Sequence, residues 1–109
     1  MPQYLIQVAY NENALQSLIN NPQDRLEAVR PSVEKLGGKL IQGYFAFGDY
    51  DAVLIVDMPD NVAASAIAIA FGGGGACRAV KTTPLMTAAE AVEAFQRASR
   101  AGYRAATAG

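Results

Sequence analysis

A chain of 109 residues has the length of one domain, and its 51% of hydrophobic residues excludes a disordered protein. The formal net charge of −1 argues against partners such as nucleic acid or a membrane surface, which favour a strongly basic face. Histidine is absent, which removes the commonest general base and zinc ligand, so we expect neither a bound metal nor another cofactor.

Cysteine usage and the length of the apolar runs indicate the cellular compartment. Cys77 is the single cysteine, so no disulfide can form within the chain, and a free thiol suits a reducing compartment. No N-terminal segment joins positive charge to an apolar run, and the apolar stretch 62–71 is too short to cross a bilayer. We therefore expect a cytoplasmic protein without a membrane partner.

The first part of the chain predicts a strand followed by helices. Residues 3–10 alternate in character with the period of two that is typical of a strand. Leucines and an isoleucine within 15–19 favour a short helical segment. Asn21-Pro22 predicts the start of a longer helix, whose apolar residues recur every three or four positions until Gly37-Gly38 ends it.

The middle of the chain predicts a hairpin. Strands are expected over 40–47 and 50–57, with Gly48-Asp49 between them as a two-residue turn. Residues 52–56 are all apolar, which is typical of a strand covered on both faces. The helices of a domain this small can cover one face, so the other cover must come largely from elsewhere.

A further helix and strand follow the hairpin. Asp60 is a suitable N-cap for a helix that continues to Phe71 and is rich in alanine, so that it can approach a sheet closely. After the glycines at 72–75, residues 76–83 predict a fourth strand that ends before Pro84.

A terminal helix completes the pattern. Thr87 and Glu90 have the spacing of a capping box, and we expect Val92 and Phe95 on the buried side of this helix. The order is β-α-β-β-α-β plus a helix, which is the ferredoxin-like α+β arrangement with a four-stranded antiparallel sheet. One domain over 1–98 and a loose tail over 99–109 are expected. The doubly apolar strand predicts that two sheets pair face to face in a homodimer or a higher homo-oligomer.

Residues 47–51, with the sequence Phe-Gly-Asp-Tyr-Asp, resemble the signature of the GYD domain family. The segments Leu36-Gly37-Gly38-Lys39 and Asp57-Met58-Pro59-Asp60 look like the helix end and the helix start of that family. The similarity runs from about Tyr4 to Glu90. The chain departs from the usual pattern in having Asp49 between the glycine and the tyrosine.

The resemblance implies a dimeric α/β-barrel, in which two ferredoxin-like sheets close on each other, and it implies no assigned activity. Relatives in the wider superfamily include cofactor-independent monooxygenases, lactone isomerases, haem enzymes and ligand-sensing domains. Fold analogy therefore does not select one function.

The Gly48–Asp51 segment is the first candidate site. Asp49 or Asp51 is a candidate base, with Tyr50 or Tyr44 as proton donor or hydrogen-bond partner, and Gly48 and Asp49 are candidate ligand contacts. In the alternative interpretation the segment is a turn, in which the glycine adopts a positive φ and the aspartates bond local amides.

Pro2 is an alternative catalytic candidate. Removal of Met1 would leave a secondary amine before the first strand, which tautomerases of the 4-oxalocrotonate type use as a base. Arg78 would then hold a carboxylate substrate. The alternative is an ordinary chain terminus.

Aromatic residues mark the first two strands and predict either an apolar ligand pocket between sheets or ordinary packing. These residues are Tyr4, Tyr10, Tyr44, Phe45 and Phe47. The leading hypothesis is a homo-oligomeric protein that binds a small organic ligand. The alternatives are a cofactor-independent enzyme, similar to a monooxygenase, an isomerase or a tautomerase, and a structural or regulatory assembly subunit.

Overall fold

The computed structural model describes residues 1–106. Within them, one sheet is formed by β1 (Gln3–Tyr10), β2 (Lys39–Phe45), β3 (Ala52–Asp57) and β4 (Cys77–Leu85), in the order β2-β3-β1-β4. The helices of this part of the chain are α1 (Glu12–Asn20), α2 (Arg25–Lys35), α3 (Asn61–Gly73) and α4 (Ala88–Ser99). Every neighbouring pair of strands is antiparallel, and the predicted α+β ferredoxin-like fold is confirmed.

The ends of α2 are set by local hydrogen bonds. The predicted start at Asn21-Pro22 is wrong, because the Asp24 carboxylate accepts the N–H groups of Leu26 and Glu27 and so caps a helix that begins at Arg25. The predicted end is confirmed. Gly37 has a φ of +85°, and the Gly38 N–H donates to the Val33 carbonyl at 3.0 Å, as in a Schellman motif.

The connection between β2 and β3 is longer than the sequence suggests. The predicted two-residue hairpin at Gly48-Asp49 is wrong, since the strands stop at Phe45 and Ala52 and leave a loop over 46–51. The Ala46 N–H donates to the Asp51 carbonyl at 2.7 Å and closes this loop. Gly48 does not adopt the positive φ that a primed turn would require.

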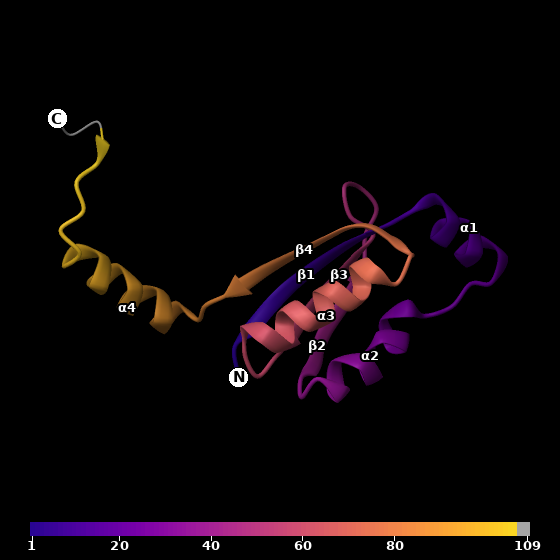
Figure 1. Cartoon of the computed structure of the whole chain (residues 1–109), viewed down its shortest axis with the longest axis horizontal. Coiled ribbons are helices and arrows are strands. Elements are labelled where there is room, and N and C mark those ends of the chain that lie inside the picture. Colours follow the sequence, from indigo (N-terminus) through magenta and orange to yellow (C-terminus); the bar gives the residue numbers. More distant parts are fainter. Residues whose placement is uncertain (107–109) are drawn as a thin grey trace.

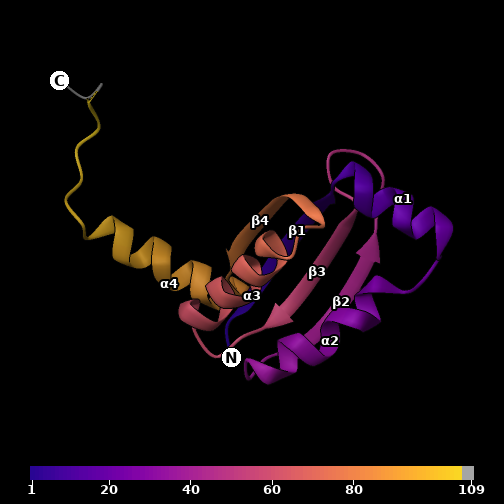
Figure 2. The same cartoon turned by 45° about the vertical axis from the view of Figure 1, so that its right-hand side comes forward.

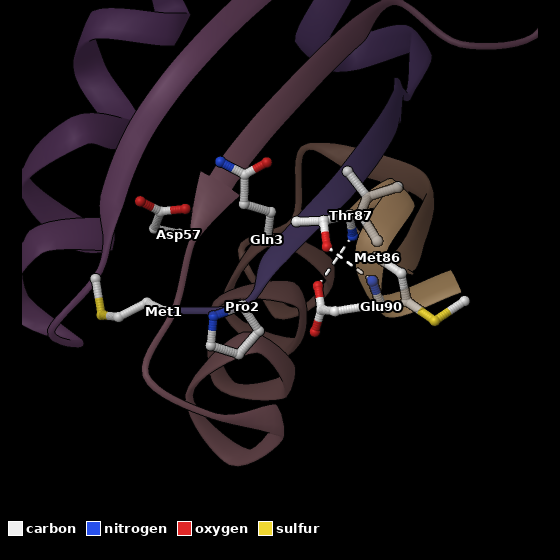
Figure 3. Close-up of a pocket in the computed structure, with 8 residues that line it drawn as sticks. Met1, Pro2, Gln3, Asp57, Met86, Thr87 and Glu90 are labelled. Atoms are coloured by element: carbon white, nitrogen blue, oxygen red, sulfur yellow. Dashed lines mark hydrogen bonds between the residues drawn. The ribbon is translucent and has the colours of Figure 1, made fainter. Parts of the chain in front are cut away.

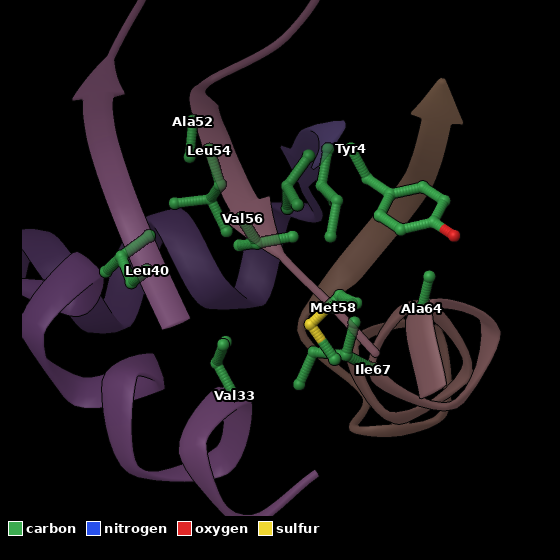
Figure 4. Close-up of a cluster of buried hydrophobic side chains, with 11 residues drawn as sticks. Tyr4, Val33, Leu40, Ala52, Leu54, Val56, Met58, Ala64 and Ile67 are labelled. Atoms are coloured by element: carbon green, nitrogen blue, oxygen red, sulfur yellow. The ribbon is translucent and has the colours of Figure 1, made fainter. Parts of the chain in front are cut away.

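The core lies between one face of the sheet and the helices α2 and α3 (Figures 1 and 2). Alternate residues of β1 and β3 point into it and meet Val33 of α2 and Ile67 of α3 (Figure 4). The hydroxyl of the buried Tyr4 donates to Asn61 Oδ1 at 2.6 Å, so this polar group is satisfied at the edge of the core.

The opposite face of the sheet carries no helix (Figures 1 and 2). In the register of the strands, Leu5 lies opposite Ile55 and Gln7 lies opposite Val53, and these side chains are only half-buried. We call this the open face. Residues 52–56 therefore have their predicted cover on one side only within the chain, and the second cover, a paired sheet, stays a prediction.

α4 leaves the body of the domain and makes the molecule 58 Å long (Figures 1 and 2). Its predicted capping box is confirmed: the Thr87 hydroxyl accepts the Glu90 N–H at 3.1 Å, and the Glu90 carboxylate accepts the Thr87 N–H at 2.9 Å. The expected burial of Val92 and Phe95 is wrong, because they are 54% and 74% exposed.

The expected tail over 99–109 falls partly outside the described residues, which end at 106. Over residues 1–106, the helices are all too short or too polar to cross a bilayer.

Candidate functional site

The loop over 46–51 is fastened to β1 by Asp51. The Asp51 N–H donates to the Val8 carbonyl at 2.8 Å, and Asp51 Oδ2 accepts the Tyr10 N–H at 2.8 Å. A carboxylate that accepts a backbone N–H is held in one orientation. Asp51, predicted as a base, is thus positioned as an anchor of the loop.

Several of the predicted site residues meet at this loop. Gly48, Asp49, Tyr50 and Arg78 line one pocket of about 330 Å³, which we call the loop pocket. Arg78 reaches it because the pairing of β1 with β4 shifts between Ala9 and Tyr10, which leaves Arg78 as the extra residue of a bulge. One Arg78 Nη donates to the Asp49 carbonyl at 3.3 Å.

Tyr44 lies apart from the loop pocket. It faces the open side of the sheet opposite Val53, and its hydroxyl donates to Gln42 Oε1 at 3.2 Å. The residues that line the loop pocket do not include it. The predicted trio of Tyr50, Asp51 and Tyr44 is therefore not brought into one cluster within the chain.

The other aromatic candidates are divided between the two faces of the sheet. Tyr4 and Tyr10 point to the helix-covered side, where Phe45, which pairs with Ala52, also lies. Phe47 is in the loop and is 100% exposed. A single chain therefore forms no aromatic pocket from these residues within the part that the structure describes.

Pro2 lines a separate and wider space of about 600 Å³ at the far end of the sheet, next to the start of α4 (Figure 3). Asp57 and Glu90 also line it. The hydrogen bonds from Thr87 hold the pKa of Glu90 below its usual range, and the carboxylate is already used in the capping box. Arg78 is not here, since β1 begins opposite Leu85, about 23 Å along β4 from Arg78.

One cluster was not anticipated from the sequence. Tyr10, Arg25 and Cys77 line a cavity between the sheet and the helices. Burial raises the pKa of the Tyr10 phenol and of the Cys77 thiol, and the Arg25 guanidinium offsets part of both shifts. These residues come from β1, α2 and β4, and no spacing in the sequence links them. Among residues 1–106, no group of three or more Cys, Asp or Glu side chains is placed to hold a metal ion.

Comparison with known proteins finds one matching family. No curated protein matches the chain in sequence. The family model of the GYD domain matches residues 4–95, which include the sheet apart from Gln3, as well as the loop over 46–51 and much of α4. The match spans far more than half of the 109 residues, and the chain therefore belongs to the GYD domain family.

Proposed function

We propose that this GYD domain is a self-associating cytoplasmic protein that binds a small organic molecule in the loop pocket. The observation that carries the proposal is the meeting of Gly48, Asp49, Tyr50 and Arg78 around one pocket of about 330 Å³. This volume is at the lower end of the range of small-molecule sites.

The Arg78 guanidinium favours an acidic group on the ligand, although Asp49 also lines the loop pocket. The Arg78 guanidinium offers several N–H donors, and its one hydrogen bond within residues 1–106 is the long one to the Asp49 carbonyl. A carboxylate on the ligand would accept two of these donors side by side. Tyr50 also lines the loop pocket.

Two apolar surfaces support self-association. The open face presents Leu5, Val53 and Ile55 without a covering helix, and α4 presents Val92 and Phe95. Contiguous exposed apolar surface on a soluble protein marks an interaction site. A second copy laid on the open face would cover these strands.

An assembly subunit without a ligand is the second candidate, because the same two surfaces favour it whether or not the loop pocket is filled. The enzyme alternative has less support. Its candidate base, the Asp51 carboxylate, already accepts the Tyr10 N–H, and Tyr44 lies outside the loop pocket.

Native mass spectrometry of protein purified from cells tests the proposal. We expect a dimer or higher oligomer that carries extra mass, and denaturation should release that mass as a small organic molecule. The Arg78→Gln variant should keep the oligomer and lose the extra mass, whereas Arg100→Gln, a change on the exposed end of α4, should keep both. A monomer would overturn the association. An oligomer without extra mass would favour the second candidate, an assembly subunit without a ligand.

A further inference from the structure

The helix-covered side of the sheet contains a cavity of about 140 Å³ that the sequence did not indicate. It lies between β1, β4, α2 and α3, and we call it the helix-side cavity. Most of its lining is apolar, and it is formed by Val8, Tyr10, Arg25, Val29, Phe71, Gly74, Ala76 and Cys77. An apolar cavity of about 150 Å³ inside a protein admits a molecule the size of benzene.

The helix-side cavity adjoins a second hollow of about 210 Å³ under α1. The two spaces share Tyr10, Arg25 and Ala76, so these residues stand at the boundary between them. The hollow adds polar residues, among them Ser17 and Gln23. Both spaces are lined mainly by apolar surface, and Arg25 stands at the boundary between them.

Arg25 supplies an unpaired cation at this boundary. The ion pairs within residues 1–106 are Arg30–Glu27 and Arg97–Glu93, so Arg25 has no carboxylate partner there. Its guanidinium makes one long contact, 3.4 Å from Nη1 to Gln23 Oε1. No acidic side chain lines either space. A guanidinium without a carboxylate beside an apolar cavity favours an anionic group with an apolar body.

We propose that this is a second binding site and that it takes a short amphipathic carboxylate. The carboxylate lies on the Arg25 guanidinium with the Tyr10 hydroxyl as a further donor, and an apolar group of about six carbons fills the helix-side cavity. The Tyr10 phenol is protonated at neutral pH and can donate, and burial raises its pKa further. The site shares no lining residue with the loop pocket, so it can be confirmed or refuted separately from the proposed function.

Cys77 allows the occupancy of the cavity to be measured directly. It is the single cysteine of the chain and lines the cavity. In its reaction with iodoacetamide, the Cys77 thiolate sulfur displaces iodide, and the added mass is read by mass spectrometry. We expect hexanoate to slow this alkylation to a plateau, because a ligand in the cavity shields the sulfur. Acetate, which lacks the apolar body, and hexylamine, which carries the opposite charge, should leave the rate unchanged.

Two arginine variants test whether the carboxylate of the ligand binds Arg25. Arg25→Gln should raise the hexanoate concentration needed for half-protection by about tenfold or more, since a charged hydrogen bond is lost. Each variant is compared with its own rate without ligand, because Arg25 also lowers the pKa of Cys77. Arg100→Gln should behave as the wild type. Absence of protection by hexanoate, equal protection by hexylamine, or wild-type protection in Arg25→Gln would each overturn the site.

Discussion

Gly38 lies between the end of α2 and the start of β2, in close contact with the segment that follows β3. A Cβ atom there would lie 2.5 Å from the backbone oxygen of Asp57 and would also collide with the Met58 sulfur. Backbone cannot move aside as a flexible side chain can. The close approach of these two chain segments therefore requires a residue without a side chain.

We predict that Gly38→Ala lowers the free energy of unfolding by about 1–3 kcal/mol, the usual cost of overpacking. Urea denaturation measures it. Gly72→Ala is the matched control, because Gly72 lies in α3 with no atom near its hypothetical Cβ. It should be neutral or stabilising, since alanine favours a helix. Equal stability of the two variants would mean that the chain around Gly38 relaxes freely.

Tyr10 makes stability depend on pH at the alkaline end. Burial raises its pKa in the folded protein, and an unfolded tyrosine titrates near about 10. The stabilisation is therefore complete below pH about 10 and is lost as the pH rises through the folded value. We predict that the stability of the wild type relative to Tyr10→Phe is constant below pH about 10 and falls as the pH rises above it, as measured by urea denaturation.

Tyr103→Phe provides the comparison, because Tyr103 is an exposed tyrosine changed in the same way. This variant should follow the wild-type curve across the alkaline range. A constant difference between wild type and Tyr10→Phe at every pH would show that the phenol does not titrate differently in the folded state.

The structural roles of some residues could be predicted from neighbouring positions in the sequence, whereas the roles of others could not. The capping role of Asp60, which accepts the Ala63 N–H at 2.9 Å, involves positions three apart and is visible in the sequence. The meeting of Arg25 with Tyr10 and Cys77 depends on how α2 lies over the sheet. No pattern of spacing encodes that approach, so the helix-side cavity could only be found in three dimensions.

Among the elements, α4 shows most clearly what a pattern can and cannot indicate. Both its capping box and its apolar stripe can be recognised in the sequence. Periodicity shows that one side of a helix is apolar, but it does not show which surface covers that side. The expected burial of Val92 and Phe95 within the chain therefore failed, although the helix itself was predicted.

We predict that Phe95→Asp weakens self-association without lowering the stability of a single copy, because Phe95 is largely exposed and makes no part of the core. Sedimentation velocity over a range of concentrations measures the first effect, and urea denaturation of dilute protein measures the second. Gln96→Asp adds the same charge to the adjacent position and should leave association as it is. Loss of stability in Phe95→Asp would instead place α4 against its own chain.

The loop over 46–51 shows why the ends of strands and the loops between them are hard to predict from sequence. Glycine followed by aspartate between two apolar runs is a hairpin signal, but here Asp51 is bonded to Val8 and Tyr10 of β1. These bonds reach across about forty residues of sequence and fasten Asp51 to β1, just before β3 begins at Ala52. Strand ends that depend on such distant partners are not predictable from neighbouring residues.

At the scale of the whole molecule, the fold was predictable because the order of elements admits few topologies, whereas no pattern in the sequence shows whether a second copy covers the open face. We predict that Val53→Asp, which places a charge at the middle of the open face, converts the oligomer to a monomer. Light scattering coupled to size-exclusion chromatography measures the mass.

Val62→Asp is the matched control, because Val62 is an exposed valine in the first turn of α3, where a negative charge is favourable. This variant should elute with the wild-type mass. If both variants kept that mass, the open face would not be the contact surface, and α4 alone would remain as the means of association.

The outer strands of the sheet are both irregular. β2 has a shift of register between Leu40 and Gln42, and β4 has the bulge at Arg78 and also contains Pro84, which has no N–H to donate. A strand that is interrupted in this way is a poor template for another strand, so lateral growth into fibrils is discouraged. We therefore expect concentrated protein to form particles of finite size rather than fibrils.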